Sequence, residues 1–158
     1  VTPVQVEVEI QDNGRTLVKN YVYRVQFELP AGWTFTPSHS GLGSANYDNG
    51  AGSSVRLSIT IDDTNTSAEE FMDTRAFEYR VGFDFTVNRK GSTSQGGFQL
   101  AYLEMSGEYN SERIHNYWIF LRSRGVLVEF AFSGDIDTAR TAINQIQASI
   151  QQTPYQAP

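Results

Sequence analysis

Apolar and polar residues alternate along several segments of the chain, which is the pattern of strands with one buried and one solvated face. The clearest examples are residues 4–10, 21–29, 55–61 and 83–87. The Asp-Asn-Gly of residues 12–14 predicts a hairpin turn, since Asn-Gly tolerates the positive φ that tight turns need. We expect the second strand to begin at Thr16, to be interrupted near Asn20, and to resume at Tyr21.

Two later segments, residues 117–121 and 126–132, are apolar at both parities, apart from Glu129. Neither face of such a strand can be left to water, so both strands belong at the centre of the sheet. The polar residues 122–125 between them have the length of a hairpin loop. After Gly134 the apolar residues recur at spacings of three and four, which predicts a helix with one buried stripe: Ile136, Ala139, Ile143, Ile146 and Ile150.

A second helix is predicted over about residues 67–79, where Ser67 and Glu70 have the spacing of a capping box. Its buried residues would be Ala68, Phe71, Met72, Tyr79 and the aliphatic stem of Arg75. Residues 38–54, 88–97 and 108–115 are polar or glycine-rich, and we expect them to be loops. A phosphate-binding loop around Gly41 is excluded, because no lysine and no helix start stand at the required offsets.

The order of these elements predicts an α+β fold with a mainly antiparallel central sheet of about six strands. Most connections are short and hairpin-like, which favours antiparallel pairing. Because the central strands are apolar on both faces, we expect helices to cover both, as in an α/β/α sandwich. Residues 1–151 would form this single domain, and the proline-broken residues 152–158 a flexible tail or linker.

Composition narrows the possible functions. The 158 residues include 12 basic and 18 acidic side chains, for a net charge of -6, which argues against binding to nucleic acid. No apolar run approaches the length that spans a bilayer. The absence of cysteine and the abundance of neutral polar residues favour an exported protein. Since the chain begins at Val1, we expect that an upstream segment was removed, which could have carried a lipid anchor.

One short motif resembles a known family. Tyr23-x-Val25-x-Phe27-x-Leu29-Pro30-x-Gly32-Trp33 is similar to the opening of the PsbP-like family, the relatives of an extrinsic photosystem II protein. The strand-helix-strand middle, the strand at residues 100–105 and the closing helix extend the resemblance over residues 21–151. It implies an exported protein, often a lipoprotein, that serves as a binding or assembly accessory. The acidic character of this chain departs from the basic photosystem member.

Four residues are candidates for a ligand or partner surface: Trp33, Tyr47, His115 and Glu129. Trp33 follows a strand-ending turn, where a large aromatic residue either plugs the core or serves as an exposed platform. Glu129 interrupts an apolar strand, and burial of an unpaired carboxylate costs several kcal/mol. It is either paired with an arginine (Arg122, Arg24 or Arg80), or exposed, or a pocket acid with a raised pKa. His115 is either an exposed loop residue or a ligand contact.

Two functions remain open. The first is a non-catalytic exported accessory or binding module of the bacterial cell envelope, in the periplasm or at the cell surface, whose partner is another envelope protein or a small ligand. The alternative is a hydrolase-type enzyme with a noncanonical site in the loops at the sheet end. With no cysteine, two histidines and no nucleophile-elbow motif, the residues favour the first. We expect a monomer with no metal and no cofactor.

Overall fold

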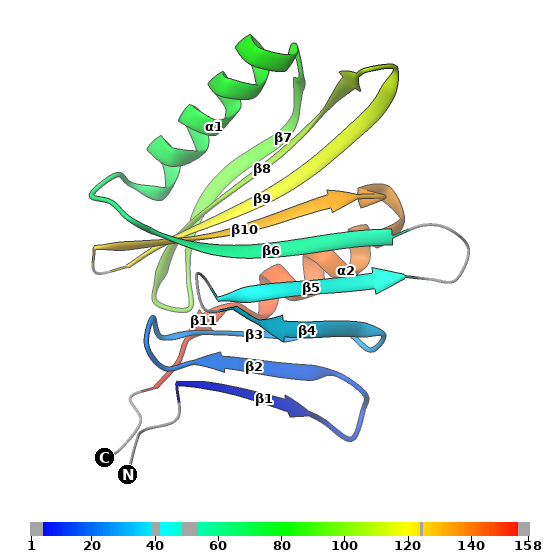
Figure 1. Cartoon of the computed structure of the whole chain (residues 1–158). Coiled ribbons are helices and arrows are strands. Elements are labelled where there is room, and N and C mark those ends of the chain that lie inside the picture. Colours follow the sequence, from blue (N-terminus) through cyan, green and yellow to red (C-terminus); the bar gives the residue numbers. More distant parts are fainter. Residues whose placement is uncertain (1–4, 39–41, 49–53, 124, 155–158) are drawn as a thin grey trace.

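The structure is a computed structural model that describes residues 5–38, 42–48, 54–123 and 125–154. Two antiparallel sheets and two helices make up the described chain (Figure 1). The small sheet has the order β1-β2-β3-β11, with bounds Val6–Ile10, Thr16–Asn20, Val25–Leu29 and Gln151–Gln152. The large sheet has the order β4-β5-β6-β10-β9-β8-β7, with bounds Trp33–Pro37, Gly43–Asp48, Ser54–Asp63, Val126–Gly134, Glu112–Ser123, Phe98–Tyr109 and Thr86–Gln95.

A mainly antiparallel α+β fold is therefore confirmed, but the single sheet of about six strands becomes two sheets of four and seven strands. Covering of both faces by helices is not confirmed in that form. One face of the large sheet packs against α1 (Ala68–Phe83). The other face packs against the small sheet together with α2 (Ile136–Ser149), so a sheet does part of the covering that was expected of helices.

Strands β9 and β10 contribute to both hydrophobic cores, as their two-sided apolar pattern predicted. Ile119 and Phe130 face the small sheet and α2, whereas Trp118, Phe120 and Leu127 face α1. All five are nearly inaccessible to solvent. These two strands are the centre of the molecule in packing as well as in the order of the large sheet.

Helix α1 begins at the predicted cap, Ser67, and helix α2 begins after Asp135, a cap that was not predicted. Ser67 accepts a hydrogen bond from the Glu70 amide at 3.1 Å, and Asp135 accepts one from the Thr138 amide at 3.3 Å. Helix α2 buries the predicted stripe. Helix α1 continues to Phe83, four residues beyond the prediction, and ends at Asp84, whose φ of 57° is left-handed. Neither helix of the described chain is long and apolar enough to cross a membrane.

Three predicted segments differ from the structure. Residues 16–29 are a hairpin and not one interrupted strand: the Asn20 side chain accepts from the Tyr23 amide at 2.8 Å, and Arg24 takes a positive φ of 56°. Most of residues 88–97 belongs to β7, an edge strand whose backbone pairs with β8 while most of its side chains stay exposed. The predicted loop at 108–115 is mostly the paired ends of β8 and β9.

Two further predictions fall partly on undescribed residues. Within the predicted loop 38–54, residues 43–48 form β5, and residues 39–41 and 49–53 lie outside the described chain. In the predicted tail, Gln152 pairs with Val25 in β11, and Thr153 is fully buried. Gln152 and Thr153 thus belong to the fold, and residues 155–158 lie outside the described chain.

Candidate binding site

A buried charge cluster joins α2 to the large sheet. Glu104 of β8 is 3% exposed, and its two oxygens accept from two nitrogens of Arg140 at 2.7 and 2.8 Å. Its Oε2 also lies 2.7 Å from Nε2 of His115 on β9. Arg140 further donates to Asp137 at 3.0 Å, and Nδ1 of His115 lies 3.9 Å from the same carboxylate. We call these four residues the charge cluster.

The electrostatics of the charge cluster keep Glu104 ionised. The hydrogen bonds from Arg140, together with the contact with His115, lower the pKa of Glu104 to about 2 against the opposing effect of burial. The same bonds raise the pKa of Arg140 above its ordinary value. A carboxylate with such a low pKa and three close contacts, two from Arg140 and one from His115, is a poor general base near neutral pH.

The charge cluster also contains the residue types of a metal site. Ligand atoms of Glu104, His115 and Asp137 lie within 4.8 Å of one another. However, both oxygens of Glu104 already accept from Arg140, so the guanidinium supplies the positive charge that a cation would bring. The donor set therefore fits an internal ion-pair network better than a metal centre.

Glu129 lies on the opposite face of the large sheet, against α1. It is 7% exposed, and both of its oxygens accept from one nitrogen of Arg75, at 2.9 and 3.0 Å. Its partner is thus none of the three arginines expected from the sequence. Arg122 instead donates to the Thr64 carbonyl, and Arg24 to the Thr153 carbonyl at 2.9 Å. Burial raises the pKa of Glu129, and the nearby Arg75 offsets only part of this effect.

The four candidate residues do not form one site. Trp33 is 6% exposed, stacks on Tyr47 at 5.7 Å between ring centroids, and meets the edge of Phe132 at 6.4 Å. It therefore plugs the core, and Tyr47 is its half-buried neighbour. His115 is buried in the charge cluster and not exposed in a loop. His115 and Glu129 lie on opposite faces of the sheet, so only Trp33 and Tyr47 meet.

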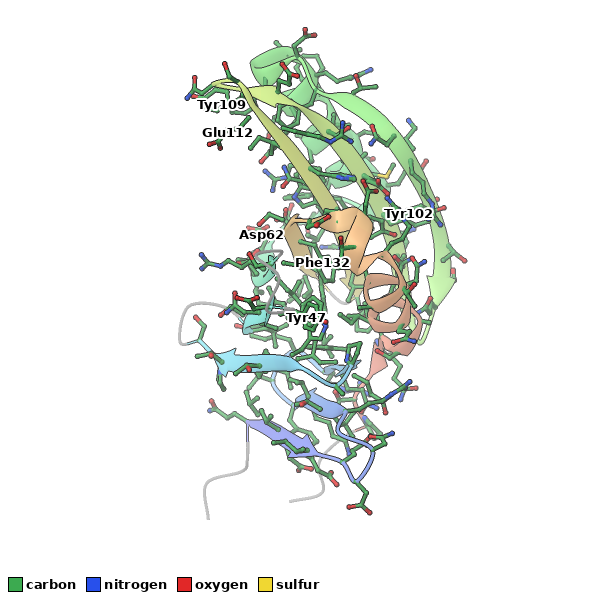
Figure 2. All side chains as sticks on the ribbon, turned by 90° about the vertical axis from the view of Figure 1, so that its right-hand side faces the viewer. Tyr47, Asp62, Tyr102, Tyr109, Glu112 and Phe132 are labelled. Carbon is green, nitrogen blue, oxygen red and sulfur yellow. The ribbon has the colours of Figure 1, made fainter. Side chains whose placement is uncertain are left out.

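A different place has the properties of a binding site. Between the end of α1 and the β8–β9 hairpin lies a hollow of about 220 Å³, here called the aromatic hollow. Its lining is mostly aromatic and consists of Tyr79, Phe83, Phe85, Tyr109, Ile114 and Asn116. Phe83 and Tyr109 are 43% and 52% exposed. Figure 2 shows Tyr109 with Glu112 at the end of the hairpin, far from Tyr47 and Phe132.

Ring contacts hold the aromatic hollow in shape. Tyr79 lies 4.9 Å from Trp118, 5.4 Å from Phe83 and 5.6 Å from Phe85 between centroids. Phe83 also meets Tyr109 edge-on at 5.5 Å. Such edge and tilted pairs contribute about 0.5–1.5 kcal/mol each beyond burial. The lining is therefore fixed by packing before any ligand arrives.

Two backbone features position the aromatic hollow. The left-handed Asp84 reverses the chain after α1, so that Phe83 and Phe85 lie near each other, with ring centroids 5.8 Å apart. Gly107 on β8 leaves room for Phe85, because a Cβ at that position would lie 2.4 Å from the ring. Two polar groups of the lining are unengaged: the side-chain amide of Asn116 and the hydroxyl of Tyr109 make no hydrogen bond to any described residue.

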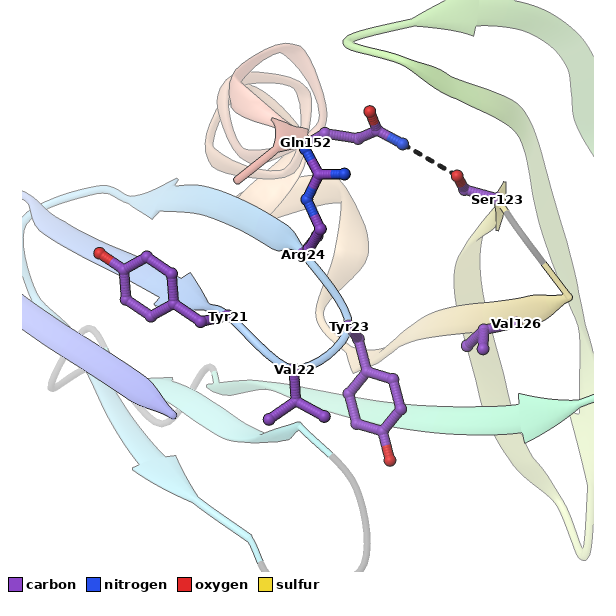
Figure 3. A pocket seen from close by; sticks show the side chains of 7 residues that line it. All are labelled: Tyr21, Val22, Tyr23, Arg24, Ser123, Val126 and Gln152. Carbon is purple, nitrogen blue, oxygen red and sulfur yellow. Dashed lines mark hydrogen bonds between the residues drawn. The ribbon is translucent and has the colours of Figure 1, made fainter. Parts of the chain in front are cut away.

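A second hollow, of about 280 Å³, lies beside the turn between β2 and β3 (Figure 3). It is lined by Tyr21, Val22, Tyr23, Arg24, Ser123, Val126 and Gln152. Here polar groups of the lining are already hydrogen-bonded within the protein: Gln152 donates to the Ser123 hydroxyl at 2.8 Å, and Arg24 donates to the Thr153 carbonyl. Val22 and Tyr23 are 56% and 39% exposed. We therefore regard this hollow as the weaker candidate.

Sequence reasoning missed both the aromatic hollow and Glu104. Phe83 and Phe85 looked like alternate residues of one strand, but the helix ends between them. Glu104 sits in the apolar run 100–105, so the criterion that singled out Glu129 applies equally to it. The stem of Arg75 was expected on the buried face of α1, which was the available signal for the partner of Glu129.

Comparison with known proteins supports the fold. No protein-family model matches the chain, and no curated protein matches it in sequence. Among solved structures it is similar to cyanobacterial PsbP (CyanoP) from Synechocystis sp. PCC 6803, with a TM-score of 0.67 and 13% identity over 90% of this chain and 95% of that one.

Two bacterial structures are also similar. One is LpqN, involved in cell envelope biogenesis of Mycobacterium tuberculosis, with a TM-score of 0.61 and 16% identity over 95% of this chain and 91% of that one. The other is PA94 from Pseudomonas aeruginosa, a protein of unknown function described as a putative regulator, with a TM-score of 0.58 and 11% identity over 96% and 99%. The resemblance to the PsbP-like group is thus confirmed as a shared fold across most of the chain.

Proposed function

We propose that the chain is a non-catalytic accessory module of the bacterial cell envelope that binds a partner protein through the aromatic hollow. The observation that carries this proposal is the hollow itself: a preformed aromatic lining with an exposed rim and unengaged polar groups. The envelope location is supported by the likeness to LpqN and by the composition of the chain.

The size of the aromatic hollow favours a protein partner. At about 220 Å³ it is smaller than the roughly 300–1,000 Å³ of sites that enclose a small molecule. It is large enough for one apolar or aromatic side chain of the kind that anchors protein interfaces. The Tyr109 hydroxyl and the Asn116 amide could then bond to the backbone beside that side chain.

The charge cluster supports the non-catalytic part of the proposal. Glu104 is held by Arg140 and His115, and both ring nitrogens of His115 face carboxylates. None of these residues lines either hollow described above. A hydrolase would need a convergent pair of titratable groups at a cleft, and the charge cluster is closed by its own contacts.

A titration with small apolar compounds tests the site. Adding N-acetyl-tryptophanamide should shift the NMR signals of Ile114 and the Asn116 side-chain amide. Tyr109→Ser should abolish these shifts, because it removes one wall of the hollow. Phe77→Ser is the matched control: Phe77 is also on the surface, at 59% exposure, but does not line the hollow. Equal shifts in both variants, or none in the parent protein, would overturn the assignment.

A crosslinking experiment tests the partner. A photo-reactive phenylalanine analogue at position 109 should capture the same protein in repeated envelope preparations, and the same analogue at position 77 should not. Recombinant partner should then bind the parent protein and lose about tenfold or more in affinity with Tyr109→Ser, as expected for an interface anchor. A partner that binds Tyr109→Ser with unchanged affinity would refute a role for the hollow.

A further inference from the structure

The outer edge of the small sheet is a second surface, at the opposite end of the molecule from the aromatic hollow (Figure 1). Strand β1 pairs with β2 on one side, and no described residue pairs with its other side. An open strand edge carries unpaired backbone groups and accepts further strands unless it is protected.

The alternation of backbone hydrogen bonds between β1 and β2 shows which backbone groups of β1 face outward. Gln5 accepts from the Tyr21 amide at 2.8 Å, and Gln11 donates to the Arg15 carbonyl at 2.8 Å. Bonded and non-bonded pairs alternate in an antiparallel ladder, so the odd-numbered residues of β1 bond to β2. The N–H and C=O groups of Val6, Val8 and Ile10 therefore point to the open edge.

The side chains of the same residues continue the core face of the small sheet. Val8 stands opposite Val18, which stands opposite Phe27, and the exposed fractions along this row are 43%, 0% and 1%. In the next row Ile10 stands opposite Thr16, with exposed fractions of 77% and 7%. The apolar face of the small sheet thus extends onto β1, where its side chains are no longer buried. One more strand beside β1 would shield them from solvent.

The other face of β1 carries two carboxylates: Glu7 stands opposite Lys19 of β2 and accepts from the Tyr21 hydroxyl at 3.3 Å, whereas Glu9 stands opposite the uncharged Leu17. Glu7 and Glu9 are its two polar side chains, and the strand has no basic residue. If a second copy paired antiparallel about Val8, Glu7 would stand opposite Glu9 of the copy, and like charges placed directly opposite each other are destabilising. A strand with basic residues at these two places would instead meet opposite charges.

We propose that β1 is a docking edge for an extended segment of a partner protein in which apolar and basic residues alternate. The segment adds as a fifth strand, with its apolar side chains beside Val8 and Ile10 and its basic side chains beside Glu7 and Glu9. Backbone bonds to Val6, Val8 and Ile10 supply affinity, and the alternate side chains supply specificity. This surface is separate from the aromatic hollow, so the two proposals stand or fall independently.

Fluorescence anisotropy with labelled peptides tests this proposal. A peptide of alternating valine and lysine should bind, and a peptide of alternating valine and glutamate should bind about tenfold more weakly or worse. On binding of the lysine peptide, hydrogen exchange at the amides of Val6, Val8 and Ile10 should slow. Equal binding of the two peptides, or unchanged exchange at β1, would overturn the proposal.

Two variants separate edge pairing from general attraction. Val8→Pro removes an outward N–H without touching the ladder to β2, and should weaken binding about tenfold or more. Val8→Thr keeps that N–H and is the matched control, with little change expected. Glu7→Lys combined with Glu9→Lys should reverse the preference toward the glutamate peptide. Circular dichroism shows whether each variant is folded.

Two results would contradict the proposal even if the peptides bind. Unchanged peptide binding by folded Val8→Pro would mean that the peptide does not pair with the backbone of β1. Concentration-dependent dimers of the parent protein that Val8→Pro abolishes, measured by analytical ultracentrifugation, would make a second copy the occupant of the edge in place of a basic partner.

Discussion

Glu104 and Glu129 are two nearly buried carboxylates on opposite faces of the large sheet, and each is bonded to an arginine from a helix. Their pKa values nevertheless shift in opposite directions, to about 2 for Glu104 and upward for Glu129. Burial opposes ionisation at both. At Glu129 burial is the largest effect on the pKa, whereas at Glu104 the hydrogen bonds from Arg140 outweigh it.

The two arginines bind with different geometry. Two nitrogens of Arg140 each reach a separate oxygen of Glu104, in the forked arrangement that makes such pairs strong. A single nitrogen of Arg75 serves both oxygens of Glu129, and Nε of Arg75 is buried without a partner. One pair is fully satisfied and the other only in part.

The neighbouring charges differ as well. The contact with His115 helps to lower the pKa of Glu104, whereas Asp62 and Glu78 help to raise that of Glu129. Glu78 also takes a second nitrogen of Arg75, at 3.3 Å. A buried Arg–Glu pair is therefore not one kind of interaction. The effect of burial, set against the number of hydrogen-bond donors and the nearby charges, decides whether the carboxylate is stabilised as an anion.

The largest effect should come from breaking the stronger pair. Arg140→Met leaves the ionised Glu104 buried with His115 alone, and we expect the free energy of unfolding at pH 7 to fall by about 3–5 kcal/mol. Urea denaturation measures this. In the double variant with Glu104→Leu most of the loss should be recovered, because the unpaired charge is gone. A loss below about 1 kcal/mol would show that the fork is not a strong interaction.

The pH dependence should then separate the two carboxylates. The folded pKa of Glu104 is lowered, so its stabilisation is complete above its ordinary pKa and is lost as the pH falls toward about 2. Between pH 7 and pH 3 the stability advantage of the parent protein over Glu104→Gln should shrink by about 2 kcal/mol. Denaturation at several pH values measures it, and a constant difference would contradict the assigned pKa.

The smallest effect should come from Glu129→Gln. The folded pKa of Glu129 is raised, so its charged form costs stability above that pKa, and this cost disappears as the pH falls through it. Glutamine keeps an acceptor for Arg75 and removes the buried charge, so the change at pH 7 should stay within about 1 kcal/mol. As the pH falls, the free energy of unfolding of the parent protein should therefore rise relative to that of Glu129→Gln. This is the opposite of the change expected between the parent protein and Glu104→Gln.

The sequence predicted correctly the elements whose apolar residues follow a regular spacing or cover both faces of a strand. The stripe from Ile136 to Ile146 and the two-sided strands β9 and β10 follow directly from apolar spacing, and both are confirmed. Strand β7 was missed because an edge strand is held by backbone bonds, which impose no apolar pattern on its side chains. The second sheet was missed because alternation predicts strands but not the sheet to which each belongs.

The sites were less predictable because they join residues distant in the chain. The bonds of Glu129 and Glu104 span 54 and 36 residues, respectively, to their arginines. The sequence singled out one of the two carboxylates but not its partner. The aromatic hollow depends on the left-handed turn at Asp84, a residue type that tolerates this conformation without requiring it.

The position of β11 has a consequence for how the chain folds. The small sheet takes its last strand from the C-terminal end of the described chain, and Arg24 beside it bonds to Thr153, 129 residues away. Contacts between residues so far apart in sequence form slowly, because closing the long loop loses entropy before the new contacts contribute any stabilisation. During synthesis β1, β2 and β3 can pair with one another locally, but β3 gains β11 only after nearly all of the described chain has been made. We therefore expect the pairing of β3 with β11 to be among the last steps of folding.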